Sequence, residues 1–226
     1  MDLVFVIDSS LSIRDSNPID GSLDHWTLIL DFVTDVVSRL PVSDDRMRVG
    51  LVPFSTSVDL DNVLPVSGQL DVILSRIERL YFLGGNTNTS GALRVARVLL
   101  SDVRSHVTGS KQVVMLITDG LSNVDPQLTL QEARAAKQGG IVVYAIGISE
   151  YTDVYELQDV ASDPAAYYYI PVDEFSLLNL VINEVLDKLV CSAPPPAARE
   201  LHALYTSAEI LSDRPPSRLR INFRPA

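Results

Sequence analysis

The stretch DLVFVIDSSLS, residues 2–12, decides the fold of this 226-residue chain. Its apolar run, residues 3–7, has no polar interruption, which predicts a strand that is buried on both faces of a sheet. Similar runs rich in Val, Ile and aromatic residues occur at residues 48–54, 113–118, 141–146 and 167–170. In a weaker run at residues 58–64, apolar and polar residues alternate. This run follows the one at residues 48–54 too closely for a crossover connection. It is therefore predicted to be an antiparallel edge strand.

Segments with helical periodicity separate these runs. The plainest has apolar residues at Trp26, Ile29, Leu30 and Val33, which lie on one face of a helix. Helices are predicted at residues 26–40, 70–80, 92–99, 130–138, 154–161 and 177–189. The alternation of strands and helices predicts an α/β fold. We expect a doubly wound, mainly parallel six-stranded sheet with one antiparallel edge strand and helices on both faces.

The composition excludes some classes of protein. The formal net charge is −11, whereas a surface that binds nucleic acid needs clustered Lys and Arg, so no nucleic-acid partner is expected. No apolar run approaches the roughly 20 residues of a membrane helix, so no membrane span is predicted. No signal-peptide pattern is visible before the first predicted strand. This fits either an intracellular protein or a piece of a longer secreted chain that lacks its signal peptide.

The chain divides into two regions. Residues 1–191 are predicted to form one globular domain, and residues 192–226 a Pro-rich linker and C-terminal tail that we expect to be disordered. The tail has five Arg and three acidic residues, so its +2 leaves −13 on the domain. Cys191 is the single cysteine. It is either a free thiol or the partner of a cysteine outside this sequence.

Three polar segments carry the chemistry. Asp8, Ser10 and Ser12 form a D-x-S-x-S run after the first strand, and Asp119 follows the strand at residues 113–118. Between them, GGNTNTSG at residues 84–91 leads into a helix. In parallel sheets, ligands bind outside the carboxyl ends of the strands, where these oxygens can converge as the hard ligands that Mg²⁺ prefers. Taken singly, each segment has a simpler explanation: a Ser-rich loop, a solvated acid or a helix cap.

Together these segments resemble the metal-ion-dependent adhesion site (MIDAS) of the von Willebrand factor A family, whose pattern is D-x-S-x-S, a distant Thr and a distant Asp. Asp8, Ser10 and Ser12 match the first part, Thr87 the middle and Asp119 the last, with Thr89 as the alternative to Thr87. The resemblance covers nearly all of residues 2–191 and includes RVGLV at residues 48–52, ITDG at 117–120 and AIGI at 145–148. It implies the Rossmann-like fold of that family.

The resemblance also implies a function. Mg²⁺, or alternatively Mn²⁺ or Ca²⁺, would be held partly through water with one position open, and a Glu or Asp carboxylate of a protein partner would complete its coordination. The implied function is that of a noncatalytic adhesion or matrix module, similar to those of matrilins, collagen-associated proteins and integrin inserted domains, in a secreted chain of the extracellular matrix. The implied partner is a matrix protein or a receptor, with collagen and self-association among the expectations.

Two other classes of protein are alternatives. An intracellular family member that scaffolds complex assembly is compatible with a single cysteine and no visible signal peptide. An enzyme with Asp8 as a phosphoryl acceptor would need a second acid at position 10, where Ser10 stands, and a basic residue beside it. No nucleotide-binding or hydrolase motif is present. We therefore expect no enzyme activity.

Residues 14–22 depart from the family pattern, because they separate the second motif serine from the first long helix. Rich in turn-forming residues, this insertion is predicted to be an exposed loop beside the metal. It is either a neutral surface insertion or a segment that shapes specificity or contacts the ion through Asp15 or Asp20. Asn88-Thr89-Ser90 is an N-glycosylation sequon. We expect it to be unoccupied, because a glycan there would crowd the metal. His25 is expected to have a surface or packing role.

Overall fold

The computed structural model describes residues 1–19, 21, 23–101, 110–149 and 152–190. Six strands form one sheet in the order β3-β2-β1-β4-β5-β6, and β3 alone runs antiparallel to its neighbour. This confirms the predicted doubly wound α/β sheet with an antiparallel edge strand. Its strands are β1 (Asp2–Asp8), β2 (Arg48–Phe54), β3 (Leu64–Ser67), β4 (Gln112–Thr118), β5 (Val142–Ile148) and β6 (Tyr169–Val172).

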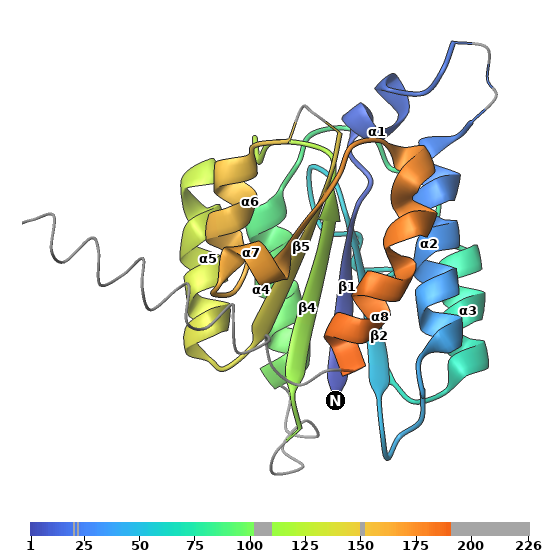
Figure 1. Ribbon diagram of the computed structural model, residues 1–226. Helices are drawn as coiled ribbons and strands as arrows, with labels where there is room; N and C mark the ends of the chain where they lie inside the picture. Colours follow the sequence, from blue (N-terminus) through green and yellow to red (C-terminus); the bar gives the residue numbers. More distant parts are fainter. Residues whose placement is uncertain (20, 22, 102–109, 150–151, 191–226) are drawn as a thin grey trace, which may run out of the picture. The chain divides into compact units, whose positions relative to one another are not determined.

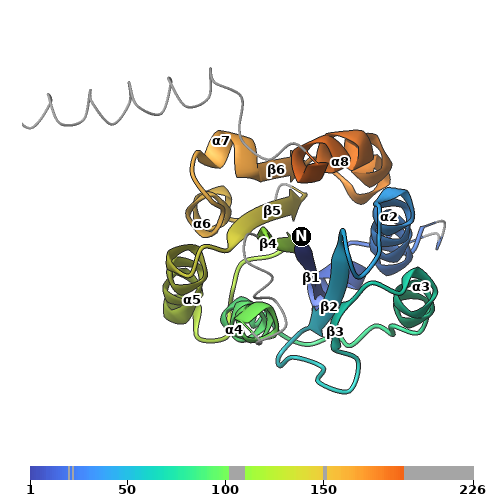
Figure 2. The ribbon, with the colours of Figure 1, turned by 90° about the horizontal axis from the view of Figure 1, so that it is seen from below.

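Helices cover both faces of the sheet (Figures 1 and 2). One layer contains α3 and α2, with the 3-10 helix η2 and α8 packed against α2, and the other contains α4, α5 and α6. A short α1 follows β1, and α7 precedes β6. The helices are α1 (Leu11–Asp15), α2 (His25–Arg39), α3 (Leu70–Glu78), α4 (Thr89–Ser101), α5 (Pro126–Gln138), α6 (Val154–Val160), α7 (Ala165–Tyr168), η2 (Phe175–Val181) and α8 (Ile182–Val190).

The position of the central strands in the core explains why apolar and polar residues do not alternate along them. Every residue of β1 is buried, and β2, β4 and β5 are buried except at their first residue. A strand that is covered by helices on both faces needs apolar side chains on both. None of the described helices is long and apolar enough to cross a membrane.

The edge strand was predicted in the wrong place. The prediction was residues 58–64, but the antiparallel strand is Leu64–Ser67, and Val58 forms only an isolated bridge with Phe54. Asp59 and Asn62 instead close a turn, because the Asn62 backbone and side-chain N–H groups both donate to Asp59. Local turn bonds of this kind outcompete pairing in a short strand.

Other element boundaries also differ from the prediction; for example, the helix predicted at residues 130–138 begins at Pro126. Residues 167–170 were predicted as a strand, but α7 ends at Tyr168 and β6 is Tyr169–Val172, because Tyr168 packs its ring against Tyr144 at a centroid distance of 4.9 Å. The predicted helix at residues 177–189 begins earlier, as the 3-10 helix η2, and becomes α-helical at Ile182. Cys191 and the tail at residues 192–226 lie outside the described residues.

Thr129 in α5 provides a test of this packing. Its side chain is fully buried, and its hydroxyl has no hydrogen-bond partner among the described residues. Removing a buried polar group that lacks a partner relieves its desolvation. We therefore expect Thr129→Val to leave the free energy of unfolding unchanged or to raise it by up to about 1 kcal/mol, measured by chemical denaturation.

Thr129→Ser is the matched control. It keeps the hydroxyl and deletes a buried methyl group, so it should lower stability by about 1 kcal/mol. A loss of stability in Thr129→Val as large as in Thr129→Ser would show that the hydroxyl is satisfied.

Candidate metal centre

The predicted site lies at the carboxyl edge of the sheet, where β1 and β4 end side by side. Asp8 is the last residue of β1, and Asp119 follows Thr118, the last residue of β4. Above them is an open crevice of about 540 Å³. The crevice is lined by Leu11, Ser12, Asp15, Ser16, Gly85, Asn86, Thr87, Asp119 and Asn123. Segments from three distant parts of the sequence therefore meet here.

Hydrogen bonds join four of the five predicted ligands. The Asp8 carboxylate accepts the Ser10 backbone N–H at 2.8 Å on Oδ1 and the Thr118 hydroxyl at 2.6 Å on Oδ2. The Ser10 and Ser12 hydroxyl oxygens are 3.1 Å apart. Ser12 donates to Asp119 Oδ1 at 2.7 Å. The structure thus brings Asp8, Ser10, Ser12 and Asp119 together in one connected cluster.

Thr87 joins this cluster from the loop that precedes α4. Gly84 and Gly85 have φ angles of +70° and +91°, which non-glycine residues rarely adopt, and they turn the loop back over β1. Thr87 N–H donates to Asn123 Oδ1 at 2.8 Å, and Asn123 N–H donates to the Thr87 carbonyl at 3.0 Å. Thr87 lines the crevice, whereas Thr89 is the buried first residue of α4 and is not part of the lining. The geometry favours Thr87 as the threonine of the site.

Both carboxylates of the cluster are buried, and no basic side chain among the described residues pairs with them. Asp8 is fully buried and Asp119 is 3% exposed, and neither forms an ion pair with any described residue. Burial raises the pKa of Asp8 above its usual value. Burial, with a smaller contribution from the Asp8 charge, raises the pKa of Asp119 to about 7. Two buried carboxylates so close together favour a bound proton or a bound cation.

The other end of β1 shows the ordinary arrangement. Asp2 is also buried, but Arg48 donates two hydrogen bonds of 2.8 Å to its carboxylate. A buried acid is stable when such a partner is present, and costly when it is absent. At Asp8 and Asp119 no protein group in the described part of the chain fills that role.

The donor set fits a hard divalent cation. No cluster of three or more His, Cys, Asp or Glu side chains that could hold a metal occurs among the described residues, and the two acids here are supplemented by hydroxyl groups. Oxygen ligands of this kind suit Mg²⁺, Mn²⁺ or Ca²⁺ and do not suit ions that prefer nitrogen or sulfur. The assignment of Asp8, Ser10, Ser12, Thr87 and Asp119 as ligands stays a prediction that the geometry supports.

The insertion at residues 14–22 is less loop-like than predicted. Its first two residues complete α1, which starts at Leu11, because Ser16 and Asn17 anchor the following turn to His25 at the start of α2. Asp15 does line the crevice, while Asp20 lies outside the described residues. His25 stacks on Phe175 with ring centroids 4.1 Å apart, a packing role as expected.

Three residues that support the cluster were missed by the sequence analysis. Thr118 orients Asp8, Asn123 holds Thr87, and Ser9 accepts the Leu83 backbone N–H at 2.8 Å through its hydroxyl. All three are adjacent to predicted motif residues or a few positions beyond them. Their contacts link distant segments, so spacing alone carried no signal for them.

The family is established by comparison with known proteins. The model of the von Willebrand factor type A domain matches residues 2–184, and the chain belongs to that family. The collagen alpha-4(VI) chain of Mus musculus is 30% identical over 218 residues, which cover 94% of this chain and 9% of the collagen chain. Matrilin-1 of Homo sapiens is 30% identical over 200 residues, which cover 88% of this chain and 38% of matrilin-1. This chain thus corresponds to a minor part of each relative.

Solved structures agree with this assignment. Proximal thread matrix protein 1 from the mussel byssus has a TM-score of 0.72 and 25% identity, over 83% of this chain and 47% of that one. A second structure of the same protein, with a zinc-occupied MIDAS motif, has a TM-score of 0.69 and 26% identity, over 84% of this chain and 45% of that one. The fold is that of the family throughout the described domain.

The raised carboxyl pKa values predict an unusual pH dependence. Without metal, the pKa of Asp119 is about 7 in the folded protein, whereas its ordinary pKa of 3.8 applies in the unfolded chain. The folded state therefore holds more protons between these values, and stability falls as pH rises through that window. In chelator, Tm should fall from pH 4.5 to pH 7.5, and Asp119→Asn should raise stability at pH 7.5 by about 2–4 kcal/mol.

The matched control is Asp71→Asn, which changes an exposed acid in α3. Its pH profile of Tm should follow that of the unmodified chain. Saturating Mg²⁺ should reverse the trend, because the ion competes with the proton and stabilises the folded state most at the higher pH. Identical profiles for the unmodified chain and Asp119→Asn would contradict the assignment.

Asn88 also generates a prediction. Its side-chain Oδ1 caps α4 by accepting the Gly91 backbone N–H at 2.9 Å, and its Nδ2 donates to the Thr56 carbonyl at 3.1 Å. The side chain is therefore held against the protein, and we expect no glycan on Asn88 in chain secreted from mammalian cells. Intact mass should not change with peptide-N-glycosidase F treatment; a loss of glycan mass that maps to Asn88 would contradict this.

Proposed function

We propose that this domain is a divalent-metal-dependent protein-binding module of the extracellular matrix. Asp8, Ser10, Ser12, Thr87 and Asp119 would hold Mg²⁺, or Mn²⁺ or Ca²⁺ in its place, in the crevice above β1 and β4. The observation that carries the proposal is the pair of buried carboxylates, Asp8 and Asp119, that no basic side chain in the described chain neutralises.

Each residue has a defined task in this proposal. Asp8 and Asp119 supply the two negative charges, and the Ser10, Ser12 and Thr87 hydroxyls supply neutral oxygens. Thr118 keeps Asp8 aligned through its 2.6 Å hydrogen bond. A bound divalent ion with so few protein charges keeps its affinity for a further anionic ligand. A Glu or Asp side chain of the partner would provide it.

The relatives support the setting. Collagen and matrilin chains are similar to this one over most of its length, and a byssal matrix protein with a zinc-occupied MIDAS motif has the same fold. We therefore propose a secreted chain and a matrix protein or receptor as partner, with collagen and self-association as specific cases. These similarities favour a matrix module over an intracellular scaffold, and binding without catalysis.

Metal binding can be measured directly. Isothermal titration calorimetry of the chelator-stripped chain with MgCl₂ and MnCl₂ should show one site. Asp119→Ala should weaken binding at least tenfold, because one of two charged ligands is lost, while Asp71→Ala in exposed α3 should have no effect. Absence of heat and of thermal stabilisation with either ion would overturn the metal assignment.

Partner binding should follow the metal. In Mg²⁺, immobilised chain should capture matrix-extract proteins that EDTA releases, and Asp119→Ala should lose them. Purified collagens and the chain itself should then be tried individually for the same metal dependence. Capture that survives both EDTA and Asp119→Ala would show that partners bind without the metal bridge.

A further inference from the structure

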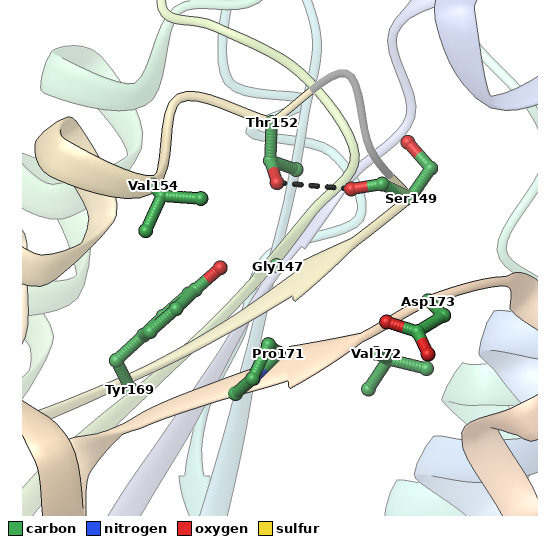
Figure 3. A pocket seen from close by; sticks show the side chains of 8 residues that line it. All are labelled: Gly147, Ser149, Thr152, Val154, Tyr169, Pro171, Val172 and Asp173. Atoms are coloured by element: carbon green, nitrogen blue, oxygen red, sulfur yellow. Dashed lines mark hydrogen bonds between the residues drawn. The ribbon is translucent and has the colours of Figure 1, made fainter.

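A second cavity lies at the same edge of the sheet, at the ends of β5 and β6 (Figure 3). It has a volume of about 480 Å³. Its lining consists of Gly147, Ser149, Thr152, Val154, Tyr169, Pro171, Val172 and Asp173, and none of these residues belongs to the predicted metal site. We call it the β5–β6 pocket.

The shape of the β5–β6 pocket depends on Gly147. A Cβ atom at this position would lie 2.6 Å from the Leu157 side chain and 3.1 Å from the ring and hydroxyl of Tyr169, closer than most real contacts. Glycine therefore lets the Tyr169 ring lie across β5, with its hydroxyl directed into the pocket (Figure 3). The side chain is largely buried, so it forms a firm wall.

The opposite wall is held in an uncommon backbone conformation. Ser149 has a φ angle of +78°, although it is not glycine. Its N–H donates to the Val172 carbonyl at 2.8 Å, and its carbonyl accepts the Thr152 hydroxyl at 3.1 Å (Figure 3). A strained residue persists only where the surrounding bonds hold it, and such residues gather at binding sites.

The chemistry of the lining matches a cation on an aliphatic stem. Val154, Pro171 and Val172, together with the Tyr169 ring, supply apolar surface. Asp173 supplies a carboxylate that forms no hydrogen bond or ion pair with another described residue. The lining contains no Lys, Arg or His. The whole domain is acidic, with −13 for residues 1–191 once the +2 of the tail is separated from the total of −11.

The pocket and the metal crevice open on one edge. Asp119 follows β4, Ser149 follows β5 and Asp173 follows β6. The three strands are parallel, and their register pairs Thr118 with Gly147 and Ile148 with Val172. Neighbouring strands are about 4.8 Å apart, so Asp119 and Asp173 are separated by about 10 Å across the edge. Glu156 of α6 also accepts the Ser122 backbone N–H and hydroxyl, at 3.2 and 2.7 Å, which ties the pocket wall to the loop after β4.

Exposed apolar side chains lie along the same edge. Leu121 is 49% exposed in the loop after β4, and Val154 and Tyr155 are 42% and 82% exposed at the start of α6. Exposed apolar groups next to polar pockets are typical of protein-binding surfaces. Leu121 lies two residues after Asp119 of the metal crevice, and Val154 lines the β5–β6 pocket.

We propose that the β5–β6 pocket binds a Lys or Arg side chain of a protein partner, with the charged end at Asp173 and the stem along Tyr169 and Pro171. That this is the same partner whose carboxylate is held at the metal rests on the proposed function above. An extended segment rises about 3.3 Å per residue, so about three or four residues would separate the acidic and basic side chains of such a partner.

The test uses small probes on the full chain in EDTA, so that it does not depend on metal. ¹H–¹⁵N NMR titrations with n-butylammonium and n-butylguanidinium should shift the amide signals of Gly147, Ser149, Thr152, Tyr169 and Asp173, with dissociation constants on the order of millimolar. The neutral analogue n-butanol should bind at least fivefold more weakly. The stronger of the two cations identifies Lys or Arg as the preferred side chain.

Asp173→Asn should weaken binding of the preferred cation at least fivefold, while Asp159→Asn, at an exposed acid on α6, should not change it. Both variants replace exposed side chains, so folding should be unaffected. Absence of shifts at the pocket at probe concentrations on the order of 50 mM, well above the expected millimolar constants, would overturn the proposal. Equal binding of n-butanol, or an unchanged constant in Asp173→Asn, would do the same.

Failure here is distinguishable from failure of the proposed function. Calorimetry with Mg²⁺ reports on the metal site alone, and Asp173→Asn should leave that affinity unchanged. If the chain binds Mg²⁺ but not the cationic probes, the metal-site proposal stands and the pocket proposal is wrong. If it binds the probes but not Mg²⁺, the pocket proposal stands and the metal-site proposal is wrong.

Discussion

The complete burial of β1 is the constraint on which the rest of the structure depends. As an inner strand of a sheet covered on both faces, it places one aspartate at each end in a region that water does not reach. Arg48 neutralises Asp2 at one end. At the other end, Asp8 lies beside Asp119 because β1 and β4 end at the same edge, and no basic side chain in the described part of the chain pairs with either carboxylate. Burial of the aspartate is thus compensated by an ion pair at one end of β1 and carries an uncompensated electrostatic cost at the other.

Hydrogen bonds from the surrounding loops hold Asp8 and Asp119 in place at the carboxyl end of β1. Thr118 donates to Asp8, Ser12 donates to Asp119, and Asn123 fixes the backbone of Thr87. These bonds favour the charged carboxylates only in part, since burial still raises the pKa of both. A preorganised set of oxygens that lacks positive charge gains free energy from a cation, and this links the stability of the domain to its binding of metal.

The carboxyl edge of the sheet carries more than one feature, and the reason is topological. Parallel strands all end at the same edge, so the residues after β1, β4, β5 and β6 gather there whatever their distance in sequence. The hydrogen bond that the Ser122 hydroxyl donates to Glu156 connects α6 with the loop that follows Asp119. A partner that covers this edge would therefore contact groups drawn from most of the chain.

The sequence by itself determined the sheet, its parallel core and the motif residues Asp8, Ser10, Ser12 and Asp119. Uninterrupted apolar runs report burial on both faces, and a strand end places the next residue at a known edge. Only the tertiary structure decided the rest. The edge strand lies later in the sequence than predicted because Asp59 and Asn62 form a turn. The strand β6 begins later than predicted because Tyr168 packs against Tyr144. Thr87 rather than Thr89 faces the crevice because Asn123, 36 residues away, holds its backbone. Such choices depend on contacts between distant segments, which local periodicity does not contain.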